Sequence, residues 1–439
     1  MKLDPVLGPI ALIFYGIGII IGAGIYSVVG VAAGLAQEGL WLSFLAGALV
    51  AFLTALSYAE MTAAFPAAGA DYIYLNRAFP KMEWAGFLVG LIVLMGGAAT
   101  ATTVAVSFGG YLKLFIDMPI ILSAFVLLAL STALNIWGLR QSSAVNIVLT
   151  LVEIGGLVLV IAAGLTHADS STPFTQPLQT ASPLQPGIMA ASAVLFFVYL
   201  GFEELANLAE EARKPERDLP LAIFASLGIT TILYVLVALS LVTLAQPSAL
   251  AKSEAPLVLA VSQAWPGSGN FLGAIALFAT ANTVLVTLVA TSRMAFSMGR
   301  DKEIPALFAN LLSSRHTPYV AALFAFATAC MLLPIGSIKI LAELSSFAAL
   351  AAFLGVNISL IALRYRLPGH RRPFRVPFSV GRLPLLPLLA IAAIIFLMAY
   401  FDWRIYAAGA ITIIASLLIF AFRAGVRRFK RRRASHPKS

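Results

Sequence analysis

Glycines cluster in the first long apolar stretch of the chain, which reads Gly16-Ile-Gly18-Ile-Ile-Ile-Gly22-Ala23-Gly24-Ile25-Tyr26. Glycine weakens a helix and permits backbone conformations that other residues avoid. If the helix unwinds at Gly22-Ala23-Gly24, the half-helix that restarts near Gly24 presents free N–H groups and a positive dipole end, which suit a carboxylate. The same glycines could instead allow neighbouring helices to pack closely. The segment therefore predicts either a carboxylate site built from backbone or a tight helix contact.

A second group of residues lies in another apolar stretch, Leu195-Phe196-Phe197-Val198-Tyr199-Leu200-Gly201-Phe202-Glu203-Glu204. Acidic residues inside such a stretch are costly in a membrane and usually face a cavity or a partner. A break here would release backbone carbonyls that accept hydrogen bonds from an ammonium group. The rings of Phe197, Tyr199 or Phe202 could close over the rest of the ligand, or they could pack in the core or face lipid.

Two carboxyl side chains, Glu153 and Glu203, lie well inside apolar stretches. A carboxyl group within a membrane can bind and release a proton, so each is a candidate for coupling transport to protons, with a structural hydrogen bond as its alternative. Sodium is the competing ion, since released carbonyls and the hydroxyls of Thr280 and Thr283 could bind it. Helix hydroxyls more often bond to their own backbone. We therefore expect protons as the coupling ion, and Na+ less so. We expect no metal site, no catalytic residue and no cofactor. Exchange of one substrate for another, which needs no coupling ion, is a further alternative.

The composition identifies the solvent of these residues as lipid. The chain has 439 residues, of which 60% are hydrophobic and only 11% charged, with a mean hydropathy of +0.95. Apolar stretches of membrane-spanning length lack the alternation of barrel strands, so the fold class is an all-α polytopic membrane protein. We place twelve transmembrane helices near 10-34, 40-64, 84-112, 119-137, 144-166, 187-211, 219-244, 270-298, 319-335, 340-363, 384-401 and 405-423.

The distribution of positive charge predicts the orientation. With twelve spans, every Lys and Arg except Lys113, Lys252, Lys339 and Arg404 falls on the side that holds both termini. An excess of Lys and Arg marks the cytoplasmic side. We therefore expect a multi-pass protein of the inner (plasma) membrane with cytoplasmic N- and C-termini, and we interpret the basic C-terminal residues as a topology anchor or lipid contact, not as a nucleic-acid site.

The chain divides into two sets of five spans. Residues 167-186 are polar and contain four prolines, which predicts an external linker. Residues 1-166 precede it as the first half, and 187-366 follow it as the second half. Because five is an odd number, the second half enters the membrane from the opposite side, and interrupted helices at corresponding positions of such halves indicate a transporter site. Residues 367-424 then hold two further helices, and 425-439 form the basic cytoplasmic tail.

Other function classes fit the residues less well. The four histidines, His167, His316, His370 and His436, all lie in predicted loops or the tail, and the spans contain no arrangement of nucleophile and base. An enzyme is therefore not expected. A channel is disfavoured because no repeated selectivity-filter segment is present. A nutrient receptor that binds the substrate without moving it is the alternative, and the oligomeric state is unknown.

Motifs spread along the chain together resemble the amino acid-polyamine-organocation superfamily of transporters. They are Gly22-Ala23-Gly24-Ile25-Tyr26, Ser57-Tyr58-Ala59-Glu60, Phe65-Pro66 through Asp71-Tyr72, Tyr199-Leu200-Gly201-Phe202-Glu203, Ala209-Glu210-Glu211, Pro215 through Pro220, Ser292-Arg293 through Arg300-Asp301, Thr317-Pro318, Leu363-Arg364 and Arg372-Pro373-Phe374-Arg375-Val376-Pro377. Each motif is weak alone, whereas their order and spacing are specific.

The resemblance implies a core of the leucine-transporter type, with five plus five inverted spans, and an α-amino-acid substrate moved by alternating access. It implies that the substrate carboxylate binds the amides of Ala23, Gly24 and Ile25, and that the ammonium binds the carbonyls of Ile20, Phe197 and Leu200. Relatives often carry a lysine near the position of Glu153, which reaches toward the first span and replaces a sodium ion. Because this chain has a glutamate there, that mechanism is in doubt here. Neutral amino acids are favoured because the rest of the expected pocket is apolar. The alternative substrates are cationic amino acids or polyamines, which would be moved by uptake or exchange. Glu203 or Glu204 would contact their positive charge.

Overall fold

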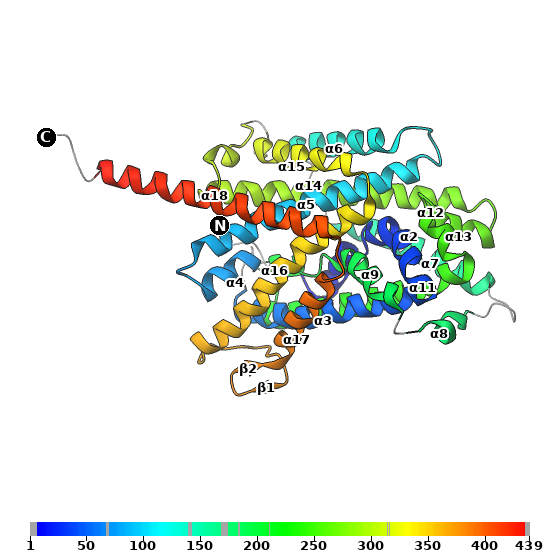
Figure 1. The fold of residues 1–439 in the computed structure, drawn as a ribbon, viewed down its shortest axis with the longest axis horizontal. Coiled ribbons are helices and arrows are strands. Elements are labelled where there is room, and N and C mark those ends of the chain that lie inside the picture. The colour runs from blue at the N-terminus through cyan, green and yellow to red at the C-terminus, as the bar shows by residue number, and fades with distance from the viewer. Residues whose placement is uncertain are drawn as a thin grey trace.

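The computed structural model describes residues 7–66, 70–138, 143–167, 174–182, 185–209, 211–313, 315 and 317–434. Parts of the predicted linker and the last residues of the predicted tail lie outside these ranges. Helices make up most of the described chain (Figure 1). Up to residue 180 they are α1 (Pro9–Ile21), α2 (Gly24–Ala36), η1 (Gln37–Gly39), α3 (Leu40–Ala64), α4 (Ala70–Ala78), α5 (Glu83–Leu112), α6 (Ile120–Trp137), α7 (Ser143–His167) and α8 (Gln176–Thr180).

The remaining elements include the longest helices. They are α9 (Pro186–Leu195), η2 (Phe196–Tyr199), α10 (Glu204–Asn207), α11 (Pro215–Leu244), α12 (Pro247–Lys252), α13 (Pro256–Ala264), α14 (Gly269–Arg300), η3 (Ala306–Ala309), α15 (Tyr319–Leu332), η4 (Leu333–Ile335), α16 (Ile338–Arg366), β1 (Ser379–Val380), β2 (Leu383–Pro384), α17 (Leu385–Met398) and α18 (Trp403–Ala434).

Nine described helical stretches are long and apolar enough to cross a membrane. Three shorter apolar helices, Pro9–Ile21, Tyr319–Ile335 and Leu385–Met398, lie among them along the chain. Large apolar side chains on the outside also fit a lipid environment: Leu130 of α6 is 59% exposed and Ile411 of α18 is 68% exposed. A mainly helical, polytopic membrane protein is therefore confirmed.

The helices that carry the predicted site pack against a few long partners. α5 lies along α14 and α16, and α3 lies along α11, while α1 contacts both α11 and α7. α2 packs against α9, so the first interrupted stretch meets the second one. Figure 1 shows α5 and α14 side by side and α16 running obliquely to them, with α18 projecting beyond the other helices at the C-terminus.

Three features differ from the expectations. The expected all-α chain also contains a small antiparallel hairpin, in which Val380 of β1 pairs with Leu383 of β2 around Gly381, whose φ is +61°. The predicted linker includes the short helix α8, and the indole of Trp41 donates a hydrogen bond of 3.2 Å to the Pro177 carbonyl within it. The last helix, α18, extends to Ala434, so the basic residues up to that point continue a helix.

Candidate functional site

The first helix is interrupted at the glycines singled out above. α1 ends at Ile21 and α2 begins at Gly24. The amide of Gly22 donates the last helical bond, 3.1 Å to the Gly18 carbonyl, and Gly22 then takes a φ of +27°. A positive φ is readily available only to glycine. The local sequence thus explains why the helix stops here and restarts two residues later.

A second interruption lies between η2 and α10. Leu200 is extended, with a ψ of 142°, and Gly201 has a φ of +118°. The two interruptions touch each other. A Cβ atom added to Gly201 would lie 3.2 Å from the Ile19 carbonyl oxygen, and one added to Gly24 would lie 3.2 Å from the Cα of Val198. Only glycine allows two backbones to approach this closely, so packing and the interruptions depend on the same residues.

Two side chains from other helices bind backbone groups at this junction. The amide of Ala23 donates a 3.0 Å hydrogen bond to Oγ1 of Thr283 on α14. The hydroxyl of Tyr234 on α11 lies 2.8 Å from the Ile20 carbonyl oxygen and 3.2 Å from that of Val198. Tyr234 therefore bridges both interruptions. Sequence reasoning missed Tyr234, since one tyrosine in a long apolar helix carries no local signal of its partners.

The predicted carboxylate-binding residues lie together at the start of α2. Ala23 and Ile25 are buried, and Gly24 is partly exposed. Because the first N–H groups of a helix have no acceptor within that helix, the amides of Gly24 and Ile25 are suited to an anion. The Ala23 amide already has Thr283 as its acceptor. A carboxylate that uses all three amides would therefore share or displace the threonine hydroxyl.

The predicted ammonium-binding carbonyls differ in their existing partners. Ile20 is buried, and its carbonyl accepts from Tyr234. The Phe197 carbonyl accepts a long 3.4 Å bond from the Leu200 amide, and Leu200 itself is partly exposed. A carbonyl oxygen has two lone pairs, so each can accept a further donor. The role of these carbonyls in binding stays a prediction.

The aromatic side chains of the second interruption pack within the protein. The Tyr199 hydroxyl donates a 2.9 Å hydrogen bond to the Phe44 carbonyl, and its ring lies 5.6 Å from that of Tyr234. The Phe202 ring lies 5.6 Å from that of Tyr58 and 5.2 Å from that of Phe353. These contacts hold the second interruption against α3, α11 and α16; a substrate contact by Tyr199 or Phe202 stays a prediction.

The two candidate coupling acids have different surroundings. Glu153 is 2% exposed, and its Oε1 atom has no hydrogen-bond partner within the described chain. Its carboxyl group interacts with the Asn282 amide, and its backbone carbonyl accepts a 3.0 Å bond from the Tyr26 hydroxyl. Glu203 instead accepts a 2.8 Å hydrogen bond from the Gly201 amide. Its carboxyl group thus pairs with a backbone amide of the second interruption.

The hydroxyls considered for sodium also separate in the structure. Thr280 donates to the Ala276 carbonyl at 2.7 Å, within its own helix. Thr283 faces the first interruption, where its oxygen accepts from Ala23. Asn282, next in the chain to Thr283, contacts Glu153. α14 thus contacts both the interruption and the buried acid through adjacent residues.

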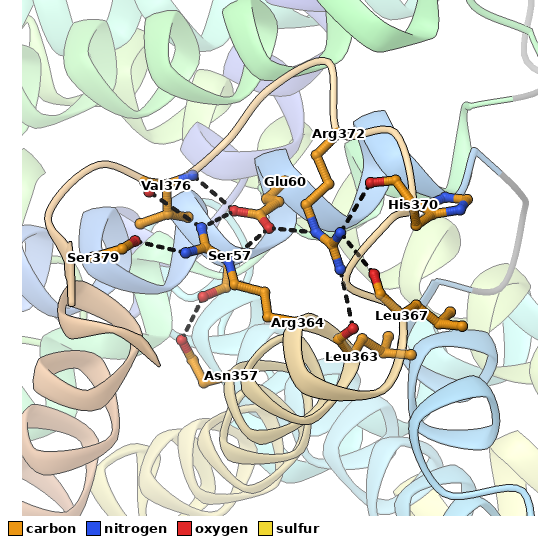
Figure 2. A network of polar contacts seen from close by, with 10 residues as sticks. All are labelled: Ser57, Glu60, Asn357, Leu363, Arg364, Leu367, His370, Arg372, Val376 and Ser379. Atoms are coloured by element: carbon orange, nitrogen blue, oxygen red, sulfur yellow. Dashed lines mark hydrogen bonds and ion pairs between the residues drawn. The ribbon is translucent and has the colours of Figure 1, made fainter. Parts of the chain in front are cut away.

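A buried ionic network lies on α3, α16 and the segment that follows α16 (Figure 2). Glu60 is fully buried and accepts from Arg364 at 2.9 Å and from Arg372 at 3.0 Å. The amide of Val376 donates to the same carboxylate at 2.7 Å. Arg372 further donates to the carbonyls of Leu363, Leu367 and His370. Arg364 donates to the Val376 carbonyl and to the Ser379 hydroxyl. The family motifs contained Glu60, Arg364 and Arg372, but their spacing did not predict this pairing.

A shorter connection joins α3 to α4. The hydroxyl of Tyr58 donates to the carboxylate of Asp71. Burial raises the pKa of Asp71 to about 6, although the hydrogen bond from Tyr58 lowers it. Since the Tyr58 ring also contacts Phe202, the second interruption is connected through α3 to the start of α4.

We expect a Tyr234→Phe variant to fold but to transport more slowly. The change removes a hydroxyl that serves the released carbonyls of Ile20 and Val198, which costs about 1 kcal/mol of stability per lost hydrogen bond. Initial uptake rates and thermal unfolding of the purified protein would be compared with those of Thr243→Val, whose hydroxyl bonds only to the Leu239 carbonyl of its own helix. Equal uptake by the two variants would contradict a bridging role for Tyr234.

Comparison with known proteins shows which sequence family the chain matches. The sequence model described as "Amino acid permease" matches residues 7–422. The branched-chain amino acid permease BcaP of Bacillus subtilis is 28% identical over 94% of this chain and 92% of its own length. The methylthioribose transporter of the same organism is 29% identical over 86% of this chain and 84% of its own. The chloroplastic cationic amino acid transporter 9 of Arabidopsis thaliana is 34% identical over 70% of this chain and 57% of its own.

Proposed function

The chain belongs to the amino acid permease family, and we propose that it is a secondary active transporter that moves amino acids across the plasma membrane by alternating access. Membership also makes it a transporter rather than an enzyme. The observation that carries the proposal is the contact between two helix interruptions, with Gly201 against Ile19 and Gly24 against Val198. Interrupted helices that meet within a membrane supply amides and carbonyls without partners in their own helix, which are the groups that an amino acid's carboxylate and ammonium need.

The proposed architecture has twelve spans with the five-plus-five inverted repeat. It is supported by the nine long apolar stretches, of which Gly24–Ala64 contains both α2 and α3, and by the three shorter apolar helices, of which Pro9–Ile21 precedes α2. α1 and α2 would together form one interrupted span, as would α9, η2 and α10. The same proposal includes the division of the chain into residues 1-166, 187-366 and 367-424. It also includes the cytoplasmic position of both termini. Cysteine accessibility from each side of the membrane, at Leu7 and at Gly267, would test the orientation.

A neutral amino acid is the proposed substrate. Apart from the hydroxyls of Thr283 and Tyr234, the side chains described at the junction are apolar: Ala23, Ile25, Phe197 and Val198. Both acids nearby already accept protein donors, Glu203 from the Gly201 amide and Glu204 from Asn207 at 2.8 Å. The relative named as a branched-chain amino acid permease fits this choice. The relative named as a cationic amino acid transporter keeps cationic substrates as the second candidate, and thermal-shift screening against both classes would decide between them.

Flux in proteoliposomes tests the proposed function. Protein-dependent accumulation of a labelled neutral amino acid, driven by an imposed proton gradient, is expected. Counterflow without accumulation under any gradient would indicate an exchanger. Binding of an amino acid without any flux would overturn transport in favour of a receptor.

Proton coupling through Glu153 is the next part of the proposal. A buried carboxylate needs a partner, and Glu153 has no ion-pair partner among the described residues, so a proton is the simplest one. We expect Glu153→Gln to lose accumulation driven by a proton gradient while keeping counterflow. Uptake would be measured with proton and sodium gradients imposed separately. Glu203→Gln, at the other candidate acid, is the matched comparison. Full proton-driven accumulation by Glu153→Gln would exclude Glu153 as the proton-coupling residue.

A further inference from the structure

A groove lies at the C-terminal end of α6, away from the helix interruptions. It measures about 240 Å³ and is lined by Ala133, Ile136 and Trp137 of α6 and by Leu312 and Arg315 of the segment before α15. Three of these side chains are aliphatic, one is an indole and one is a guanidinium. The groove therefore presents an apolar floor with a single positive charge.

The chain holds the two walls of the groove together. The hydroxyl of Thr317 donates a 2.7 Å hydrogen bond to the Ile136 carbonyl, and the Leu312 amide donates to the Thr317 carbonyl at 2.9 Å. α6 ends at Gly138 in a left-handed conformation, with φ +88°, and a Cβ atom there would lie 3.2 Å from Cγ2 of Thr317. Leu312 and Thr317, on either side of Arg315 in the chain, are thus bonded to each other, and Thr317 is bonded to the end of α6.

The positive charge is positioned by an aromatic ring. The guanidinium carbon of Arg315 lies 5.3 Å from the ring centre of Trp137, which is a cation–π contact. In the described chain Arg315 makes no ion pair with a carboxylate. Stacking on an indole leaves the planar N–H donors of arginine free for a phosphate, which they bind in a bidentate manner.

The surroundings of the groove are typical of the depth at which lipid headgroups lie. Trp137 is 64% exposed at the end of a helix long and apolar enough to span the membrane. Tryptophan is enriched at this boundary between hydrocarbon and water. On the same helix, Leu134 and Leu130, one and two turns before Trp137, are 39% and 59% exposed. These side chains extend the apolar surface along the helix in the direction that an acyl chain would take.

We propose that this groove binds an anionic phospholipid, with the phosphate on Arg315, the glycerol region beside Trp137 and an acyl chain along α6. Charge complementarity selects the anionic lipid, because a zwitterionic headgroup brings its own cation next to the arginine. The site is separate from the substrate site, so it does not depend on the proposed transport function.

Quenching of tryptophan fluorescence by brominated lipids tests this site. The protein is reconstituted in bilayers with either brominated phosphatidylglycerol or brominated phosphatidylcholine at equal mole fraction. The Trp137 signal is the difference between the protein and its Trp137→Phe variant. We expect phosphatidylglycerol to occupy the site about fivefold more strongly, since one arginine near the surface contributes ~1 kcal/mol toward anionic lipid.

Variants of arginine make the test specific. Arg315→Gln, measured with and without Trp137→Phe, is expected to abolish the preference, and Arg315→Lys to retain only part of it. Arg382→Gln removes an exposed charge elsewhere and should leave the preference unchanged. Equal quenching by the two lipids, an unchanged preference in Arg315→Gln, or loss of the preference on adding inorganic phosphate at matched ionic strength would each overturn the lipid site. A cooperative thermal unfolding transition of the same samples confirms that they are folded.

Discussion

A Gly24→Val variant is expected to reach the membrane and to show no measurable uptake of the substrate. A Cβ atom at position 24 would lie 3.2 Å from the Cα and 3.5 Å from the Cβ of Val198, so the two interruptions would be forced apart. The added methyl groups would also cover the amides at the start of α2. Overpacking of this kind typically costs about 1–3 kcal/mol, which is less than the total stability of a typical folded protein, about 5–15 kcal/mol. The loss should therefore be functional before it is structural.

Two measurements on the same variant separate these effects. Uptake into proteoliposomes should be lost, and the thermal shift caused by the substrate should disappear, while the unfolding transition without substrate remains cooperative. Gly155→Val is the matched control, because no atom lies within 4 Å of a Cβ added to Gly155, on the exposed side of α7. If Gly24→Val takes up substrate as Gly155→Val does, the assignment of the site to the first interruption is wrong.

A Glu60→Ala variant is expected to lose about 3–5 kcal/mol of stability, the usual cost of removing one partner from a buried ion pair. Glu60 is fully buried between Arg364, which is 3% exposed, and Arg372, which is 9% exposed. Without the carboxylate, two guanidinium groups stay buried without an opposite charge, and the Val376 amide loses its acceptor. The segment between α16 and α17 should then detach from α3.

Thermal unfolding in detergent, followed by fluorescence and by gel filtration of heated samples, would measure the loss. Glu216→Ala is the control, since Glu216 pairs with Arg371 at 3.4 Å with exposed side chains, and such surface pairs contribute about 0–1 kcal/mol. Glu60→Gln, which keeps the shape of the side chain and part of its hydrogen bonding, should fall between the two. Equal unfolding temperatures of Glu60→Ala and Glu216→Ala would show that the network does not stabilise the fold.

The amino-acid sequence by itself determined the class of the protein and the place of its helix interruptions. Long apolar stretches in lipid can satisfy their backbone groups only as helices, so composition and length decide the secondary structure. The interruption at Gly22 and the one at Gly201 also follow from local chemistry, because each needs a backbone conformation with positive φ that glycine adopts without strain. The ordered motifs then predicted the family that the comparisons confirm.

Only the tertiary structure decided which side chains complete the site. Thr280 and Thr283 look alike in the sequence, yet the first bonds within its own helix and the second accepts from the Ala23 amide. Likewise, Glu60 and Arg364 are 304 positions apart, and nothing in either motif names the other as its partner. The physical reason is that glycine acts through its own backbone, whereas a polar side chain in a membrane helix acts through whichever neighbour the docking of other helices brings within reach.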